Sequence, residues 1–244
     1  MPERAARALL AGLAGGRPRS GEEQEALRAL LVAHDSAVQA ATAASNELRA
    51  LVVTAPEQLR SRLEKRTQAA LVAACLSLRP GACADPARQG LSLALRSLAE
   101  RVRALRAEAR TLAHELRRRL QRLAPRLLSL YGVGPITAAS ILIAWSYPGR
   151  LRSEAAFARL AGAAPLEASS GKTIRHRLDR GGDRRLNRAL HTIVLCRRRA
   201  DPHTQAYIAR RLAQGKTSRE AVRCLKRYLA RTIYRLLEST PLPT

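Results

Sequence analysis

Two long segments of the chain carry apolar residues at alternating spacings of four and three, and this pattern constrains the fold more than any other feature of the sequence. Because the alternation averages about 3.5 residues, the apolar side chains form one stripe along an α-helix. A stripe of this kind is buried only against another helix. The sequence therefore predicts a coiled coil, formed either as an antiparallel hairpin within the chain or across a dimer. The stripe of residues 22–53 consists of Leu27, Leu31, His34, Val38, Ala41, Ser45, Leu48 and Val52, and the second consists of Leu91, Leu95, Leu98, Val102, Leu105, Ala109, Leu112 and Leu116.

The composition favours helices in the rest of the chain as well. Apolar residues make up 46% of the 244 residues and aromatic residues only 3%. Most of the apolar share is Ala and Leu, which favour helices. We therefore predict an all-α fold, with a long coiled-coil helical hairpin followed by a small helical domain that contains a helix-hairpin-helix-like element. The predicted domains are a flexible N-terminal segment at 1–21, the coiled-coil region at 22–124 and a C-terminal domain at 125–240.

Capping residues mark several predicted helix ends. Thr54 and Glu57 have the spacing of a capping box, in which each side chain bonds the other residue's backbone N–H. Thr217 and Glu220 repeat that spacing. The Pro- and Gly-containing stretch 78–90 predicts a loop. Single capping residues are predicted at Ser153 and Asp183.

The four cysteines do not have the spacing of a zinc site. Cys196 and Cys224 lie in apolar helical patterns, so we interpret them as small core residues of a protein in a reducing compartment. His34 on the first stripe is interpreted as a register-setting or half-exposed residue. The uncharged apolar runs are too short to span a bilayer, and the N-terminus has no signal-peptide pattern.

The formal net charge of +25 indicates a polyanionic partner, because folding alone does not require such an excess. Nucleic acid is the common partner of this kind, and a ribosomal or histone-like packing protein is the alternative. Only four of the 44 basic residues are lysine. Arginine suits bidentate contacts with phosphate, although the codon usage of a GC-rich genome would produce the same bias.

The stretch "LLSLYGVGPITAASILIA" at 127–144 predicts a helix, a tight glycine turn and a second helix that begins at Pro135. Backbone N–H groups at such a turn and at the following helix N-terminus can bind a phosphate. A packing corner without a ligand is the alternative. The candidate nucleic-acid contacts of this hairpin are Gly132, Val133, Gly134 and Thr137.

A second candidate site is the basic stretch that follows Ser169 and Ser170. Only Asp179 and Asp183 oppose its cations. Either serine hydroxyl can donate to a phosphate oxygen, or, if activated, attack the phosphorus while nearby cations stabilise the transition state. His191 is considered as a general base or as a structural residue on an apolar helix face. The cations, all candidate DNA or RNA contacts, are Lys172, Arg175, Arg177, Arg180, Arg184, Arg185 and Arg188.

Four motifs follow one another in the second half of the chain: "GVGPITAA", "RSEAAFARLAGAAP", "SSGKTIRHRLDRGGDRRLNRALHTIVL" and "DPHTQAYIARRLAQGKTSREAVRCLKRYLAR". In this order they resemble the C-terminal half of transposases of insertion-sequence family 110 (116/902-like). The resemblance covers about residues 127–237, and the segment "ALRALLVAHDSAVQAATAASNELRALVVTAPEQLR" resembles the family's middle region.

The resemblance implies a serine that becomes covalently linked to DNA, which carries over to Ser170, with Ser169 as second choice. It also implies an N-terminal RuvC-like domain with an acidic, magnesium-binding group, assembly into multimers, and in some members a structured guide RNA. Residues 1–21 hold one acidic residue, Glu3, so we expect no metal site or cofactor in this chain. We expect Mg²⁺ only with the RuvC-like domain.

The expected function is that of a DNA-binding serine transposase module in the bacterial cytoplasm, associated with the nucleoid. We expect it to act in transposition and recombination of an insertion sequence, to be truncated, and not to be competent alone. Its expected partners are DNA, possible guide RNA, and a further copy or a full-length transposase bound through the coiled coil. The alternatives are a catalytically silent nucleic-acid-binding remnant and a dimerising regulator of a full-length transposase.

Overall fold

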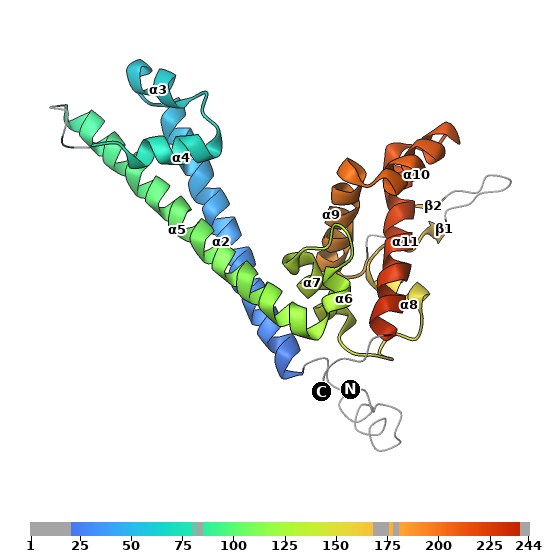
Figure 1. The fold of residues 1–244 in the computed structure, drawn as a ribbon. Coiled ribbons are helices and arrows are strands. Elements are labelled where there is room, and N and C mark those ends of the chain that lie inside the picture. The colour runs from blue at the N-terminus through green and yellow to red at the C-terminus, as the bar shows by residue number, and fades with distance from the viewer. Residues whose placement is uncertain (1–20, 80, 82–84, 168–175, 178–180, 240–244) are drawn as a thin grey trace, which may run out of the picture. The chain divides into compact units, whose positions relative to one another are not determined.

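The predicted all-α fold is confirmed by the computed structural model (Figure 1). The structure describes residues 21–79, 81, 85–167, 176–177 and 181–239. Helices α2 to α11 account for most of these residues, and a single two-stranded ribbon is the only sheet among them. The chain divides into two compact units. One comprises Ala29–Gln121, and the other comprises the described parts of Met1–Arg28 and Arg122–Thr244.

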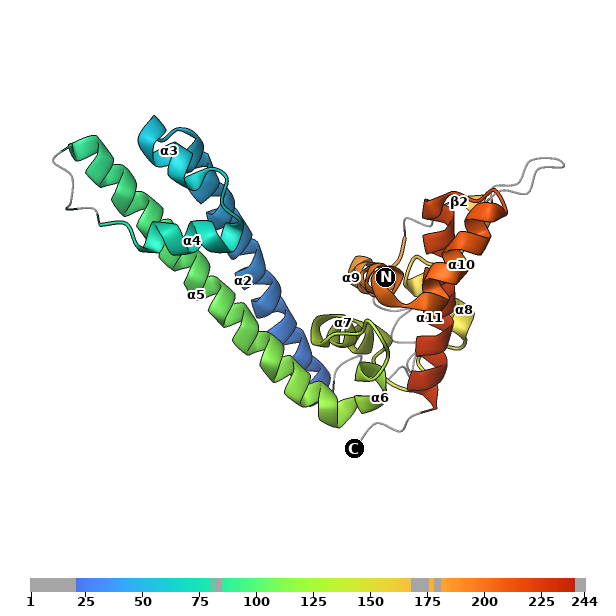
Figure 2. The ribbon, with the colours of Figure 1, turned by 45° about the horizontal axis from the view of Figure 1, so that its top comes forward.

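The first unit is built on two long helices, α2 (Glu22–Val53) and α5 (Pro86–Leu123). They lie side by side and run in opposite directions (Figures 1 and 2). The chain therefore pairs its two apolar stripes as an antiparallel hairpin, one of the two arrangements that the sequence allows. Two short helices, α3 (Glu57–Leu63) and α4 (Gln68–Leu76), connect them.

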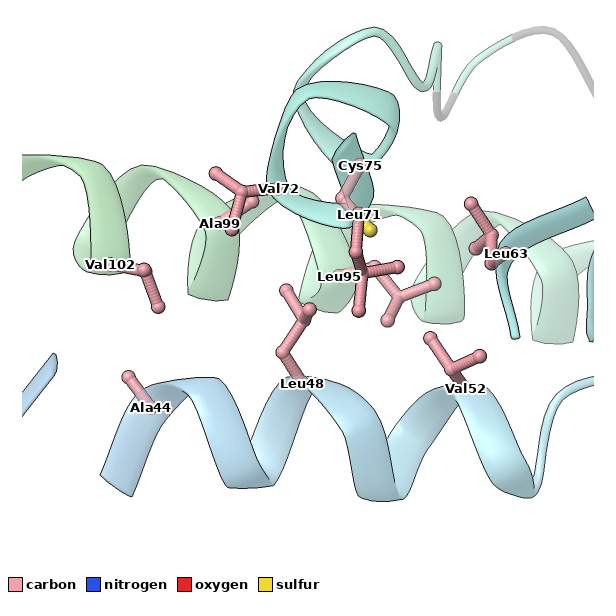
Figure 3. Close-up of a cluster of buried hydrophobic side chains, with 10 residues drawn as sticks. All are labelled: Ala44, Leu48, Val52, Leu63, Leu71, Val72, Cys75, Leu95, Ala99 and Val102. Atoms are coloured by element: carbon pink, nitrogen blue, oxygen red, sulfur yellow. The ribbon is translucent and has the colours of Figure 1, made fainter. Parts of the chain in front are cut away.

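A hydrophobic cluster joins the two long helices to α3 and α4 (Figure 3). Leu48 from α2, Leu95 from α5 and Cys75 from α4 are each completely buried in it. Burial of a leucine side chain stabilises a fold by about 2 kcal/mol, so this cluster stabilises the end of the hairpin at which α3 and α4 connect the two long helices. Its members are Ala44, Leu48, Val52, Leu63, Leu71, Val72, Cys75, Leu95, Ala99 and Val102.

The predicted stripes are mostly correct, but the stripe on α2 is wrong in its middle. Val38 is 43% exposed, and Ala37 is buried in its place. The predicted stripe took the larger apolar side chain, Val38, because the periodicity of large apolar residues was followed. In the structure the smaller side chain, Ala37, is the buried one. His34 is half-buried, beside Asp35, as one of its two interpretations expected. On α5 the residues Leu95, Val102, Ala109 and Leu116, seven apart, are buried, and Leu91, Leu98, Leu105 and Leu112 are half-buried.

Two predicted boundaries are wrong. Thr54 does not cap α3, because its hydroxyl donates instead to backbone oxygens of the last turn of α2, and Pro56 occupies the N-cap position. The stretch 78–90 is not all loop, because α5 begins at Pro86. Asp85 accepts a bond from the backbone N–H of Ala87 at 3.0 Å, so the Asp–Pro pair that resembles a loop is a helix start.

The second unit packs short helices around α9 and α11. Helix α9 contacts α7, α10 and α11, and α11 also contacts α6 and α8. Trp145, fully buried at the end of α7, donates from its indole nitrogen to Glu238 Oε1 at 2.8 Å and so ties α7 to the last turn of α11. The helices are α6 (Pro125–Leu128), α7 (Pro135–Trp145), α8 (Glu154–Leu160), α9 (Arg184–Ala200), α10 (Pro202–Ala213) and α11 (Ser218–Glu238).

Three predicted caps are confirmed in this unit. Ser153 Oγ accepts from the N–H of Ala156, and Asp183 Oδ1 accepts from the N–H of Leu186. Thr217 and Glu220 form the complete capping box of α11. In the described part of the chain, no helix combines the length and apolarity that a membrane span requires.

The cysteine interpretation is wrong for Cys196, which is exposed, and for Cys224, which is only half-buried. The apolar stripe of α9 ends at Val194, and the helix continues for more than a turn beyond the core. Cys224 lies beside Arg211, whose guanidinium donates to its sulfur at 3.8 Å.

Candidate nucleic-acid interface

The described residues on either side of the two candidate serines pair as a two-stranded β-ribbon, which the sequence does not reveal. Strand β1 (Leu166–Glu167) pairs antiparallel with β2 (His176–Arg177), and Leu166 lies opposite Arg177. Five of the candidate site residues fall outside the described residues. They are Ser169, Ser170, Lys172, Arg175 and Arg180.

Gly182 fixes the point where the basic stretch returns to the helical core. Its φ is +86°, in the left-handed region that favours glycine, and the next residue, Asp183, donates its N–H to Leu160 O at 2.6 Å. A Cβ atom at Gly182 would lie 2.3 Å from the same Leu160 oxygen. The start of α9 is thus held directly against the end of α8.

We expect Gly182→Ala to lower the free energy of unfolding by about 2 kcal/mol, because the added methyl group meets a backbone oxygen as well as an unfavourable φ. Gly215→Ala is the matched control, since Gly215 has a φ of +77° and no atom lies within 4 Å of the position that a Cβ would take there. Urea unfolding of both variants measures the difference. Equal losses in the two variants would show that the contact with Leu160 is unimportant.

A cleft lies between α9 and the first half of α11, with a volume of about 900 Å³. The α9 residues that line it follow helical spacing, so they form one face of that helix. Gly181 lies at its edge, four residues after the end of β2. The lining residues are Gly181, Arg184, Asn187, Arg188, His191, Leu195, Arg198, Ser218, Arg219, Val222, Arg223 and Lys226.

The cleft is strongly basic, and none of the described residues that line it is acidic. Two predicted contacts, Arg184 and Arg188, lie in it, whereas Arg185 is exposed and lies outside the lining. On the α11 wall, Arg223 lies 3.9 Å from Glu220, whose carboxylate also accepts the N–H of Thr217 in the cap of α11. Positive charges that line one cleft raise the local concentration of anions there.

Lys226 is the most unusual residue of this cleft. It is 6% exposed on the buried face of α11, and burial lowers the pKa of its ammonium group. Its Nζ donates to Asn187 Oδ1 at 2.7 Å. The Asn187 amide in turn donates to the backbone oxygens of Ala161, at 2.6 Å, and Gly162, at 3.2 Å. These bonds fix the amide oxygen toward Lys226, so the ammonium is held in one place.

His191 lies in the cleft and not on the apolar face of α9, the position that its structural interpretation assumed. The residue is exposed, because it is spaced with Arg184, Asn187 and Arg188 and not with the buried leucines of α9. Partial burial, and then the charge of Lys226, lower the pKa of His191 below its usual value. The imidazole is therefore neutral at pH 7, and a bound anion would favour its protonated form.

The glycine hairpin contacts the opposite face of α9. At Gly132, with a φ of +80°, a Cβ atom would meet Ile193 O, Arg197 and Cys196, which lie about half a turn from the cleft residues. The N–H of Val133 donates to Leu130 O, and that of Gly134 donates to Thr137 Oγ1. Two donors that the sequence offered to a phosphate are thus bonded within the chain, and the first helix, α6, is a single turn.

Sequence reasoning missed half of the cleft. Arg219, Arg223 and Lys226 follow one another at spacings of four and three, which places them on one face of α11. This spacing, together with the absence of acidic residues from the same face of α11, would have predicted a second basic helix face from the sequence. Arg198, on α9, continues the row of Arg184, Arg188 and His191. Among the described residues, no group of three His, Cys, Asp or Glu side chains lies together in a way that could hold a metal ion.

Comparison with known proteins finds a similarity within this second unit. Residues 124–209 match the family described as "Transposase IS116/IS110/IS902 family". The "Insertion element IS110 uncharacterized 43.6 kDa protein" of Streptomyces coelicolor is 32% identical over 155 residues, which are 62% of this chain and 38% of that protein. The chain thus spans well under two thirds of this relative's length. Residues 124–209 thus resemble a transposase domain of the kind that the four motifs predicted, and over this part the chain is similar to transposases of the IS116/IS110/IS902 family.

Proposed function

We propose that this chain binds the DNA of an insertion element and that Ser170 attacks a phosphodiester of that DNA. The family of residues 124–209 supports a role in transposition. The single observation that supports DNA binding by the second unit is the basic cleft between α9 and α11, which joins the predicted Arg184 and Arg188 to cations from a distant part of the chain. Ser170 is chosen because it occupies the Ser–Gly step of the motif that resembles the family's nucleophile.

In the proposed step, Ser170 loses its hydroxyl proton as its oxygen forms a bond to phosphorus. The bond from phosphorus to one deoxyribose oxygen breaks, and that oxygen takes up a proton. The product is a phosphoserine link between chain and DNA, with a free deoxyribose hydroxyl on the other strand segment. Cations beside the reacting phosphate stabilise the charge that develops on its oxygens, so a basic stretch around this serine suits the reaction.

The test is detection of the covalent link. The 26.6 kDa chain is incubated with labelled duplex DNA that carries an element end, alone and together with a serine-inactivated form of the 43.6 kDa Streptomyces coelicolor relative, and then denatured in detergent. We expect labelled DNA at the mass of the smaller protein, in at least the mixed sample. DNA binding with no covalent product in either sample would show that the chain is a binding protein and not a nucleophile.

A further inference from the structure

We propose that the cleft between α9 and α11 is a clamp for the phosphodiester backbone of DNA, in which Lys226 of α11 contacts a phosphate directly. This inference rests on the proposed function but concerns residues outside the predicted site. Those residues are Arg198, Arg219, Arg223 and Lys226.

The first argument is the position of the Lys226 ammonium. An ammonium group has three N–H donors, and the structure describes one acceptor for it, Asn187 Oδ1 at 2.7 Å. A buried cation next to a neutral amide is unfavourable in the free protein, as the lowered pKa of Lys226 reflects. An anionic oxygen in the cleft would supply both the missing acceptor and the missing charge.

The second argument is that the surrounding cations come from two helices. Arg184, Arg188 and Arg198 lie along one face of α9, and Arg219 and Arg223 face them from α11. Arg198 follows Arg184 by fourteen positions along α9, which is a rise of about 21 Å. Successive base pairs of duplex DNA rise about 3.4 Å, so this row can follow a backbone over several phosphates.

The third argument is that the cleft is rigid. Asn187 is held by two backbone oxygens at the end of α8, the cap of α11 is complete, and Gly182 fixes the start of α9. The cations are therefore presented on a preformed frame. A preformed frame reduces the conformational entropy that binding must overcome.

The experiment uses the full chain and fluorescence anisotropy with a labelled DNA duplex of about 30 base pairs, long enough to span the cleft more than once, over a series of KCl concentrations. We expect Arg219→Gln with Arg223→Gln to weaken binding at least about tenfold and to reduce the slope of log affinity against log salt by about 1.8. The matched control is Arg103→Gln with Arg110→Gln, which removes two exposed arginines of α5. If the control variant loses as much DNA affinity, the binding reflects the net charge of the whole chain, and the proposal that the cleft is the DNA clamp is overturned.

Lys226→Met separates a binding role from a structural one. We expect the DNA slope to fall by about 0.9 while the melting temperature does not fall, since a methionine of similar length replaces a buried charge. Lys65→Met, at an exposed lysine, is the control and should leave the slope unchanged. A lower melting temperature with unchanged DNA binding would make Lys226 a structural residue.

Two further arms identify the ligand and separate this proposal from the previous one. A duplex RNA of the same sequence replaces the DNA, and weaker RNA binding with unchanged DNA binding in the cleft variants would overturn the assignment to DNA. If covalent product forms equally in the unmodified chain and in the cleft variants, the cleft proposal fails while the proposed function stands. If the cleft variants lose DNA binding and neither they nor the unmodified chain form covalent product, the cleft proposal stands and the proposed attack by Ser170 fails.

Discussion

Ser170→Ala is expected to remove the covalent DNA product completely, whereas Ser169→Ala leaves it in place. Alanine has no oxygen that could bond to phosphorus, so the loss does not depend on how the hydroxyl is activated. The two serines are adjacent and have the same local composition of cations around them. Ser169→Ala is therefore a matched control for any change in the charge or in the flexibility of this stretch. The measurement is the yield of detergent-resistant labelled DNA per bound DNA.

Binding must be measured beside product in this comparison. We expect Ser170→Ala to bind DNA within about tenfold of the unmodified chain, because a single hydrogen bond to a charged group contributes about 1.5 kcal/mol. A variant that loses both binding and product would indicate a disturbed fold, which urea unfolding would detect. If Ser169→Ala removes the product and Ser170→Ala does not, the nucleophile is the second choice, Ser169.

The fold could be predicted from the sequence to the extent that local patterns determine it. The four–three alternation specified α2 and α5, and Asp183 and Thr217 specified where α9 and α11 begin. The exchange of Val38 for Ala37 marks the limit. Which residue of a helix faces the neighbouring helix depends on how both helices pack. At one position of α2 the buried residue is shifted by one, from Val38 to Ala37, although the apolar pattern of the sequence is the same for both choices.

The candidate site shows the same limit more clearly. Arg184 and Arg188 are found by reading along the chain because they follow one another within one basic stretch. Arg219 and Arg223 lie about thirty residues later, and only the packing of α11 on α9 brings them to the same cleft. The glycine hairpin was assigned to the same partner, yet the structure places it on the opposite face of α9. Proximity in sequence identified the type of partner but not the surface.

Lys226 resists prediction for a different reason. Its neighbours Val222, Leu229 and Ile233 define the apolar face of α11, and Lys226 occupies a position of that face. Lysine is almost never fully buried without a partner, so sequence reasoning leaves it in solvent. The partner is Asn187, which lies thirty-nine residues earlier in the chain. Nothing in the sequence around Asn187 predicts that its side chain will contact a lysine.

This pair gives the largest expected effect on stability. We expect Asn187→Ala to lower the free energy of unfolding by about 3 kcal/mol, because it removes the acceptor of a buried ammonium and the donor to Ala161 O and Gly162 O. Asn46→Ala, at an exposed position inside α2, is the control and should be neutral or slightly stabilising. Urea unfolding at pH 7 measures both.

The cause of that loss can be tested through pH. The pKa of Lys226 is lowered in the folded chain, so between that value and the ordinary lysine value of 10.5 the unfolded chain binds more protons, and stability rises with pH in this window. Loss of Asn187 lowers the folded pKa further, because the ammonium loses its acceptor, and Asn187→Ala should therefore recover part of its stability as the pH rises toward 10.5. The double variant with Lys226→Met has no ammonium to leave unpaired, so it should be more stable than Asn187→Ala at pH 7 and should lack this recovery. A double variant as unstable as Asn187→Ala would show that Asn187 stabilises the fold only through its bonds to the backbone oxygens of Ala161 and Gly162. The unpaired ammonium of Lys226 would then not be the cause of the instability, and the argument that a phosphate relieves it would fail.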